Sequence, residues 1–188
     1  MKRYAAIVFG LAGILVSPIF TPGQAPAPAS ASAQASGPPP SIGDAIRQSY
    51  SAVKGNLLKA ADKMPDAGYA FQPTPEERNF GAWVAHIADA QTSICSRAMG
   101  TPKAPSAASK TSKADLVAAL KDSFDLCDAA YAALNDANAN DTVQSFRGPS
   151  PRLAVLAFNV AHDNEGYGSM AVYLRLKGIV PPSSEPRH

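Results

Sequence analysis

Apolar residues recur every three or four positions in four stretches of the chain, and polar or Pro- and Gly-rich segments separate these stretches. Such spacing gathers the apolar side chains on one face of a helix. We therefore predict four amphipathic helices, over about 42–63, about 79–99, from the cap at Ser112 to about 135, and over 151–178. The fourth is interrupted by a polar group, the sequence HDNE at 162–165.

Capping residues support these boundaries. Ser41 is an N-cap candidate for the first helix, and Ser112 with Asp115 resembles a capping box before the third. Ser150 followed by Pro151 has the order of an N-cap and a proline in the first helical turn. The C-terminal ends carry Met64-Pro65, Gly100 and Gly178, which are typical stops.

The fold class that follows is all-α, a single four-helix bundle. The pattern contains no credible strand and no internal repeat. The connections between helices are about 15, 13 and 15 residues long, which is more than tight antiparallel turns require, so a crossover topology is open.

The first 33 residues have the organisation of a Sec signal peptide. Lys2 and Arg3 precede an apolar run over 4–20, and Ala31-Ser-Ala33 offers a cleavage site. A retained anchor is the alternative, since 17 largely apolar residues are near the minimum for a membrane span. Cleavage would leave a disordered linker at 34–40, a bundle at 41–184 and a tail at 185–188, with no stable membrane span. We expect a periplasmic or secreted protein.

Export changes how charge and cysteine are interpreted. Removing 1–33 takes away two basic residues and no acid, which leaves 15 basic and 15 acidic residues. A neutral chain without a basic, aromatic-rich patch makes nucleic acid an unexpected partner. Cys95 and Cys127 form an even pair in an oxidising compartment, which favours a disulfide between two helices. Two buried, unreactive thiols are the alternative.

Two histidines lie midway along predicted helices, His86 in the second and His162 in the fourth. Both could point into the bundle, where side chains on facing helices build metal sites. A first-row metal site usually needs three protein ligands. Asp89 and Glu165, each three residues after a histidine, are candidates for the third; Asp163 and Asn164 would then point elsewhere. The alternative is two core histidines that hydrogen-bond within the bundle.

Two segments resemble the DinB-like (DinB/YfiT-like) superfamily of four-helix bundles: NFGAWVAHIADAQ at 79–91 and NVAHDNEGYGSMAVYLRLKGIVPPSS at 159–184. The resemblance implies an up-up-down-down bundle with a long crossover over 41–184. It also implies a divalent metal, such as Zn, Ni, Fe or Mn, on one His of the second helix and an H-x-x-x-H pair of the last. These positions fall on His86, His162 and Gly166, so the third imidazole is missing, and we expect a void there that one or two waters could fill.

Two functions follow from this degenerate site. The first is a metal-dependent hydrolase or transferase of unknown substrate, with a metal-bound water as nucleophile and Glu165 or Asp163 as base. The second is a non-catalytic binding or structural bundle that has lost metal and holds a small apolar ligand, or none. The sequence leaves substrate, catalytic residues and oligomeric state, including a homodimer, undetermined.

Overall fold

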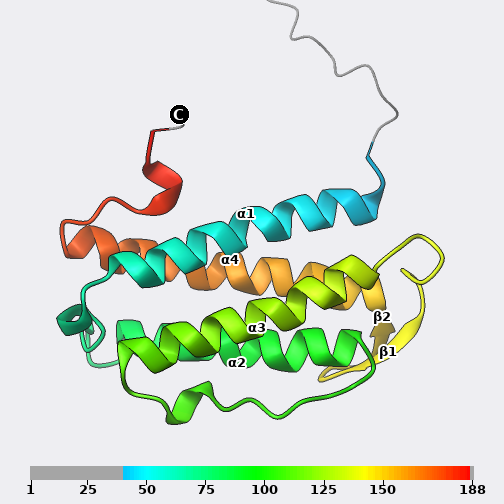
Figure 1. Cartoon of the computed structure of the whole chain (residues 1–188), viewed down its shortest axis with the longest axis horizontal. Coiled ribbons are helices and arrows are strands. Elements are labelled where there is room, and N and C mark those ends of the chain that lie inside the picture. The colour runs from blue at the N-terminus through cyan, green and yellow to red at the C-terminus, as the bar shows by residue number, and fades with distance from the viewer. Residues whose placement is uncertain (1–39, 187–188) are drawn as a thin grey trace, which may run out of the picture. The chain divides into compact units, whose positions relative to one another are not determined.

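The computed structural model describes residues 40–186, and within them the chain forms four long helices (Figure 1). They are α1 (Ile42–Lys63), α2 (Phe80–Ala98), α3 (Lys113–Ala133) and α4 (Arg152–Leu176). The predicted four-helix bundle is confirmed, with helix ends displaced by at most two residues. The signal peptide and most of the linker fall in 1–39, outside the described residues, as do the last two residues of the tail.

Three helices begin at polar caps. Ser41 accepts a hydrogen bond from the Asp44 amide at 3.1 Å, and the Asp44 carboxylate accepts one from the Ser41 amide, which completes a capping box. Asn79 caps α2 through the Ala82 amide, at 2.7 Å. Ser112 accepts from the Asp115 amide at 3.1 Å, as its sequence context suggested.

The start of α4 differs from the prediction. Residues 142–145 and 148–151 pair as an antiparallel hairpin of two short strands, β1 (Thr142–Ser145) and β2 (Gly148–Pro151), where the sequence pattern indicated only loop. Ser150 is therefore a strand residue, and the N-cap of α4 is Pro151, which provides no side-chain hydrogen bond. The hairpin turns through Gly148 at φ 100°, a conformation that glycine adopts readily.

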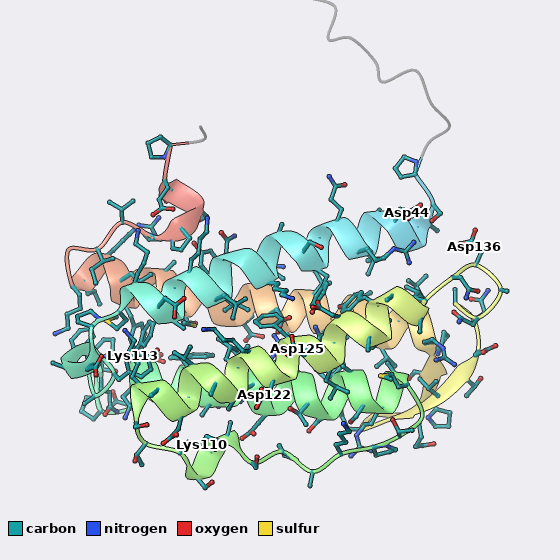
Figure 2. The ribbon with its side chains drawn as sticks, viewed as in Figure 1. Asp44, Lys110, Lys113, Asp122, Asp125 and Asp136 are labelled. Atoms are coloured by element: carbon teal, nitrogen blue, oxygen red, sulfur yellow. A yellow bond between two sulfur atoms is a disulfide. The ribbon has the colours of Figure 1, made fainter. Side chains whose placement is uncertain are left out.

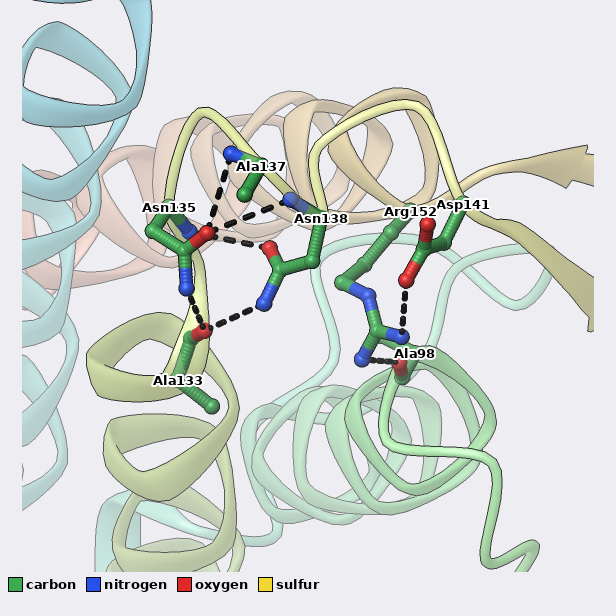
Figure 3. Close-up of polar contacts among 7 residues, drawn as sticks. All are labelled: Ala98, Ala133, Asn135, Ala137, Asn138, Asp141 and Arg152. Carbon is green, nitrogen blue, oxygen red and sulfur yellow. Dashed lines mark hydrogen bonds and ion pairs between the residues drawn. The ribbon is translucent and has the colours of Figure 1, made fainter.

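Polar contacts in the α3–α4 connection hold the beginning of α4 in place (Figure 3). Arg152 donates to the Ala98 carbonyl at the end of α2, at 2.9 Å, and lies 3.4 Å from the Asp141 carboxylate. Asn138 donates to the Ala133 carbonyl at 2.8 Å, which satisfies an acceptor at the end of α3. The connection thus fastens α4 to the ends of two other helices.

The long connection at 99–112 returns along the bundle, so that α2 and α3 run in the same direction while α1 and α4 run in the other (Figure 1). In chain order the directions are up, down, down, up, which corrects the up-up-down-down order that the resemblance implied, because the long connection follows α2 and makes α2 and α3 parallel. A disulfide between Cys95 and Cys127 joins α2 to α3, with the two Cα atoms 5.1 Å apart. Helix α4 packs between α1 and α2. The predicted long crossover is the one between the two parallel helices.

The core consists of side chains from all four helices, including Leu57, Ile87, Phe124 and Leu156. Tyr50 of α1 stacks on Tyr131 of α3 with ring centroids 3.9 Å apart. Charged side chains such as Asp122 and Asp125 lie outside, on the exposed face of α3 (Figure 2). Within residues 40–186, no helix has the length and apolar content that crossing a bilayer requires.

Candidate functional site

The structure brings the two predicted histidines together from facing helices. The Nε2 atoms of His86 on α2 and His162 on α4 lie 3.1 Å apart, and the ring centroids are 5.0 Å apart. Both residues are half-buried rather than central, so the pair lies at the edge of the core. At this distance the two nitrogens share one hydrogen bond.

Both imidazoles favour the neutral form. Burial, followed by the charge of Arg78 and by His162, lowers the pKa of His86. Burial also lowers the pKa of His162, although the carboxylate of Glu165 acts in the opposite direction. The Nδ1 atom of His162 is buried and has no hydrogen-bond partner among the described residues. The proton of His162 therefore belongs on Nε2, where it reaches His86, because an N–H at Nδ1 would lack an acceptor.

The place of the third imidazole is closed. A Cβ atom added to Gly166 would lie 2.8 Å from both Cγ1 and Cδ1 of Ile87, a fully buried side chain of α2. The expected void for one or two waters is therefore wrong at this position, because a residue from the facing helix packs directly against the glycine. Gly166 allows α2 and α4 to approach each other closely.

The two candidate replacements do not complete a ligand set. Both carboxylate oxygens of Asp89 are occupied by backbone amides, those of Ala107 at 2.6 Å and Ala108 at 2.9 Å. Glu165 is exposed on the outer face of α4. Within residues 40–186, no group of three or more His, Cys, Asp or Glu side chains is arranged to hold a metal ion. The residues present do not fit the three-ligand centre that the resemblance implies.

Asp163, expected to point away from the interior, is fully buried. Its carboxylate accepts hydrogen bonds from Asn159 at 2.9 Å and from Gln91, whose amide nitrogen lies 3.2 Å from each carboxylate oxygen. Burial raises the pKa of Asp163 to about 7, and the two amide donors oppose this increase only in part. Asp163 is therefore enclosed in the core, and its carboxylate hydrogen-bonds to Gln91 and Asn159 rather than to the histidine pair.

Asp163 belongs to a buried polar network that spans three helices. Ser123 of α3 donates to the Gln91 side chain at 2.9 Å. Tyr131 donates to the Leu156 carbonyl at 2.8 Å, and the Asn159 amide nitrogen lies 3.4 Å from its hydroxyl. The network also meets the disulfide, because the side-chain oxygen of Asn159 lies 3.8 Å from the sulfur of Cys95. Satisfied networks of this kind fix how helices dock.

The sequence pattern of α4 indicates this network, although the two histidines are the more conspicuous candidates for a site. Asn159 and Asp163 are four residues apart and continue the buried stripe formed by Leu156, Met170 and Leu174. His162 lies about 100° further around the helix, at the edge of that stripe. A search for polar residues on the inward stripe, rather than for metal ligands, would have found Asp163.

A cavity of about 600 Å³ adjoins His86, and none of its lining residues belongs to α4. The first half of α2, the 66–70 turn and the 108–111 segment enclose it. Its lining combines apolar side chains, such as Leu116, with charged ones, such as Arg78 and Lys110. This volume is within the usual range for small-molecule sites.

Substitution of two glycines in one turn of α4 tests whether the place of the third imidazole is closed. Gly168→Ala should stabilise the fold by up to about 1 kcal/mol, because alanine favours helix and an added Cβ there meets no atom within 4 Å. Gly166→Ala should instead destabilise it by about 1 kcal/mol, since overpacking against Ile87 exceeds the gain in helix propensity. Urea unfolding of the three proteins measures both changes. Equal stabilisation by both variants would show that Ile87 moves aside and that the position is open.

Comparisons with known proteins agree with this architecture. A family model described as the DinB superfamily matches residues 49–170. A DinB-like protein from Bacillus cereus ATCC 10987 has a TM-score of 0.65 at 20% identity, over 74% of this chain and 95% of that one. A DinB-like protein (YjoA) from Bacillus subtilis has a TM-score of 0.61 at 18% identity, over 77% of this chain and 99% of that one.

Among curated proteins, none matches the sequence significantly. At these identities the two solved structures support the fold alone, whereas the family model covers most of the chain. The chain belongs to the DinB superfamily.

Proposed function

We propose that this chain is a non-catalytic DinB superfamily bundle that binds a small molecule and has lost metal-dependent chemistry. The observation that carries the proposal is the packing of Ile87 against Gly166, 2.8 Å from the place of a Cβ atom. A third imidazole cannot enter there without displacement of a fully buried side chain. The cavity beside His86 is the feature that remains for a ligand.

A two-histidine cation site is the second candidate, and the distance between the imidazoles favours it. Two nitrogens bound tetrahedrally to one ion, each about 2.0–2.1 Å from it, would lie about 3.3 Å apart. The Nε2 atoms of His86 and His162 lie 3.1 Å apart, close to that value. Against this candidate, metal-bound histidines usually donate their other ring N–H to a partner, and Nδ1 of His162 has none among the described residues.

Melting experiments separate the two functions. The purified protein, stripped of metal with a chelator, should melt at the same temperature with and without added Zn²⁺, Ni²⁺, Fe²⁺ or Mn²⁺. A functional site at about 100 times its Kd would add about 2.7 kcal/mol and raise the Tm by about 5–10 °C. His86→Ala is the control, because it should change stability by the same amount in both conditions. A metal-dependent rise in Tm that His86→Ala abolishes would favour the two-histidine site.

The proposed place of action is outside the cytoplasm. The N-terminal sequence at 1–33 supports export through its signal-peptide organisation. The disulfide between Cys95 and Cys127 supports it independently, since such bonds persist mainly in oxidising compartments.

A further inference from the structure

We propose that the cavity beside His86 binds a small organic anion, an apolar body that carries one acidic group, and that Arg78 and Lys110 hold this group. The inference rests on the proposed binding function and adds the chemical class of the ligand. It follows from the way in which charges around the cavity are already paired.

The acidic residues of the cavity have partners within the protein. Asp89 lines it, but both of its oxygens accept hydrogen bonds from the amides of Ala107 and Ala108. Asp66 lies 3.8 Å from the ammonium group of Lys113. Neither carboxylate forms an ion pair with Arg78 or Lys110 within residues 40–186.

The basic residues of the cavity have no such partners. Within residues 40–186, the side chains of Arg78 and Lys110 form no ion pair. Arg78 lies over the ring of Trp83, 4.9 Å from its centroid, and its charge acts on His86. Lys110 lies on the connection that leads into α3 (Figure 2), and it also lines the cavity. Among the described residues, the cavity therefore presents two basic side chains without an ion-pair partner, beside an imidazole that favours the neutral form.

The remaining walls are suited to the apolar body of such a ligand. Leu116 of α3, Tyr69 and the small side chains Ala82 and Ala85 of α2 line the cavity. Sites of this kind combine a mainly apolar lining with a few polar groups that set orientation. Arg78 is suited to this task, because guanidinium groups form paired hydrogen bonds to acidic oxygens.

A pair of fluorescent probes tests the proposal on the full chain. Anilinonaphthalene sulfonate carries an acidic group, and phenylnaphthylamine has the same aromatic body without one. Arg78→Gln and Lys110→Gln should each weaken binding of the sulfonate by about 10-fold and leave the neutral probe unchanged. The matched controls Arg97→Gln and Lys59→Gln, which replace cations outside the cavity, should affect neither probe.

The outcomes separate this inference from the proposed function. Ala82→Trp fills the cavity and should abolish binding of both probes. If it does, but Arg78→Gln and Lys110→Gln leave sulfonate binding intact, the cavity binds small molecules without selecting an anion, and the inference is overturned alone. If Ala82→Trp leaves both probes bound, the cavity is not a ligand site, and the proposed function fails with the inference.

Discussion

Raising the pH from about 4 to about 8 should lower the free energy of unfolding of the natural protein by about 4 kcal/mol more than that of Asp163→Asn. Burial raises the pKa of Asp163 from 3.8 to about 7, so the folded state binds a proton that the unfolded state has already lost over this interval. The stability contribution is complete below pH 3.8 and is lost as the pH rises through about 7. Chemical unfolding at closely spaced pH values measures the difference between the two proteins.

The variant also serves as the control for other titrating groups. The lowered pKa values of His86 and His162 act in the opposite sense, because their contribution is present above the unfolded value of 6.5 and is lost as the pH falls. These terms are common to both proteins and cancel in the difference. A constant difference between pH 4 and 8 would mean that Asp163 keeps an ordinary pKa in the core.

Removal of the disulfide should be the second large effect. Cys95 and Cys127 are 32 residues apart, and closing a loop of this length stabilises a fold by about 4 kcal/mol in the chain-entropy model. Replacing both cysteines with alanine should therefore lower the Tm by about 8–16 °C. Differential scanning calorimetry of the oxidised protein and of the double variant measures this change.

Reductant provides the matching control. Both cysteines are fully buried, so the folded protein should react slowly, whereas reductant present during unfolding should lower the Tm of the natural protein towards that of the variant. The variant itself should not respond. An unchanged Tm after full reduction would contradict the expected entropic contribution.

The helices could be predicted because each carries a long apolar stripe, and because α1, α2 and α3 begin at a polar cap. Ser41 and Ser112 act as their local sequences suggested. The hairpin before α4 could not be predicted, since four-residue strands are too short to show a reliable alternation of apolar and polar residues. The error at Ser150 has the same origin, because pairing with Val143 places that residue in a strand before it can cap a helix.

In the candidate site, too, some features could be predicted from the local sequence pattern, whereas others depend on packing between helices. The pairing of His86 with His162 was accessible because facing helices bring residues of similar depth together. The sequence could not show that the place of the third imidazole, at Gly166, is filled. The filling depends on the rotamer of Ile87, a residue of another helix, and no local sequence pattern reports it.

Asp163 was predicted to point elsewhere because His162 was placed on the inward face, and successive helix residues lie about 100° apart. The structure instead places Asp163 inward, where the amides of Gln91 and Asn159 donate to it.

The parallel arrangement of α2 and α3 determines how this chain can reach its native state. Consecutive helices usually dock as local hairpins, but these two can pair only after the 99–112 segment has returned along the length of the bundle (Figure 1). Their contacts thus join residues far apart in sequence, and such topologies fold slowly. The Cys95–Cys127 bond keeps the second halves of both helices tethered in the unfolded oxidised chain, which shortens the conformational search for this step. Oxidation before folding would thus act on the rate at which the bundle assembles.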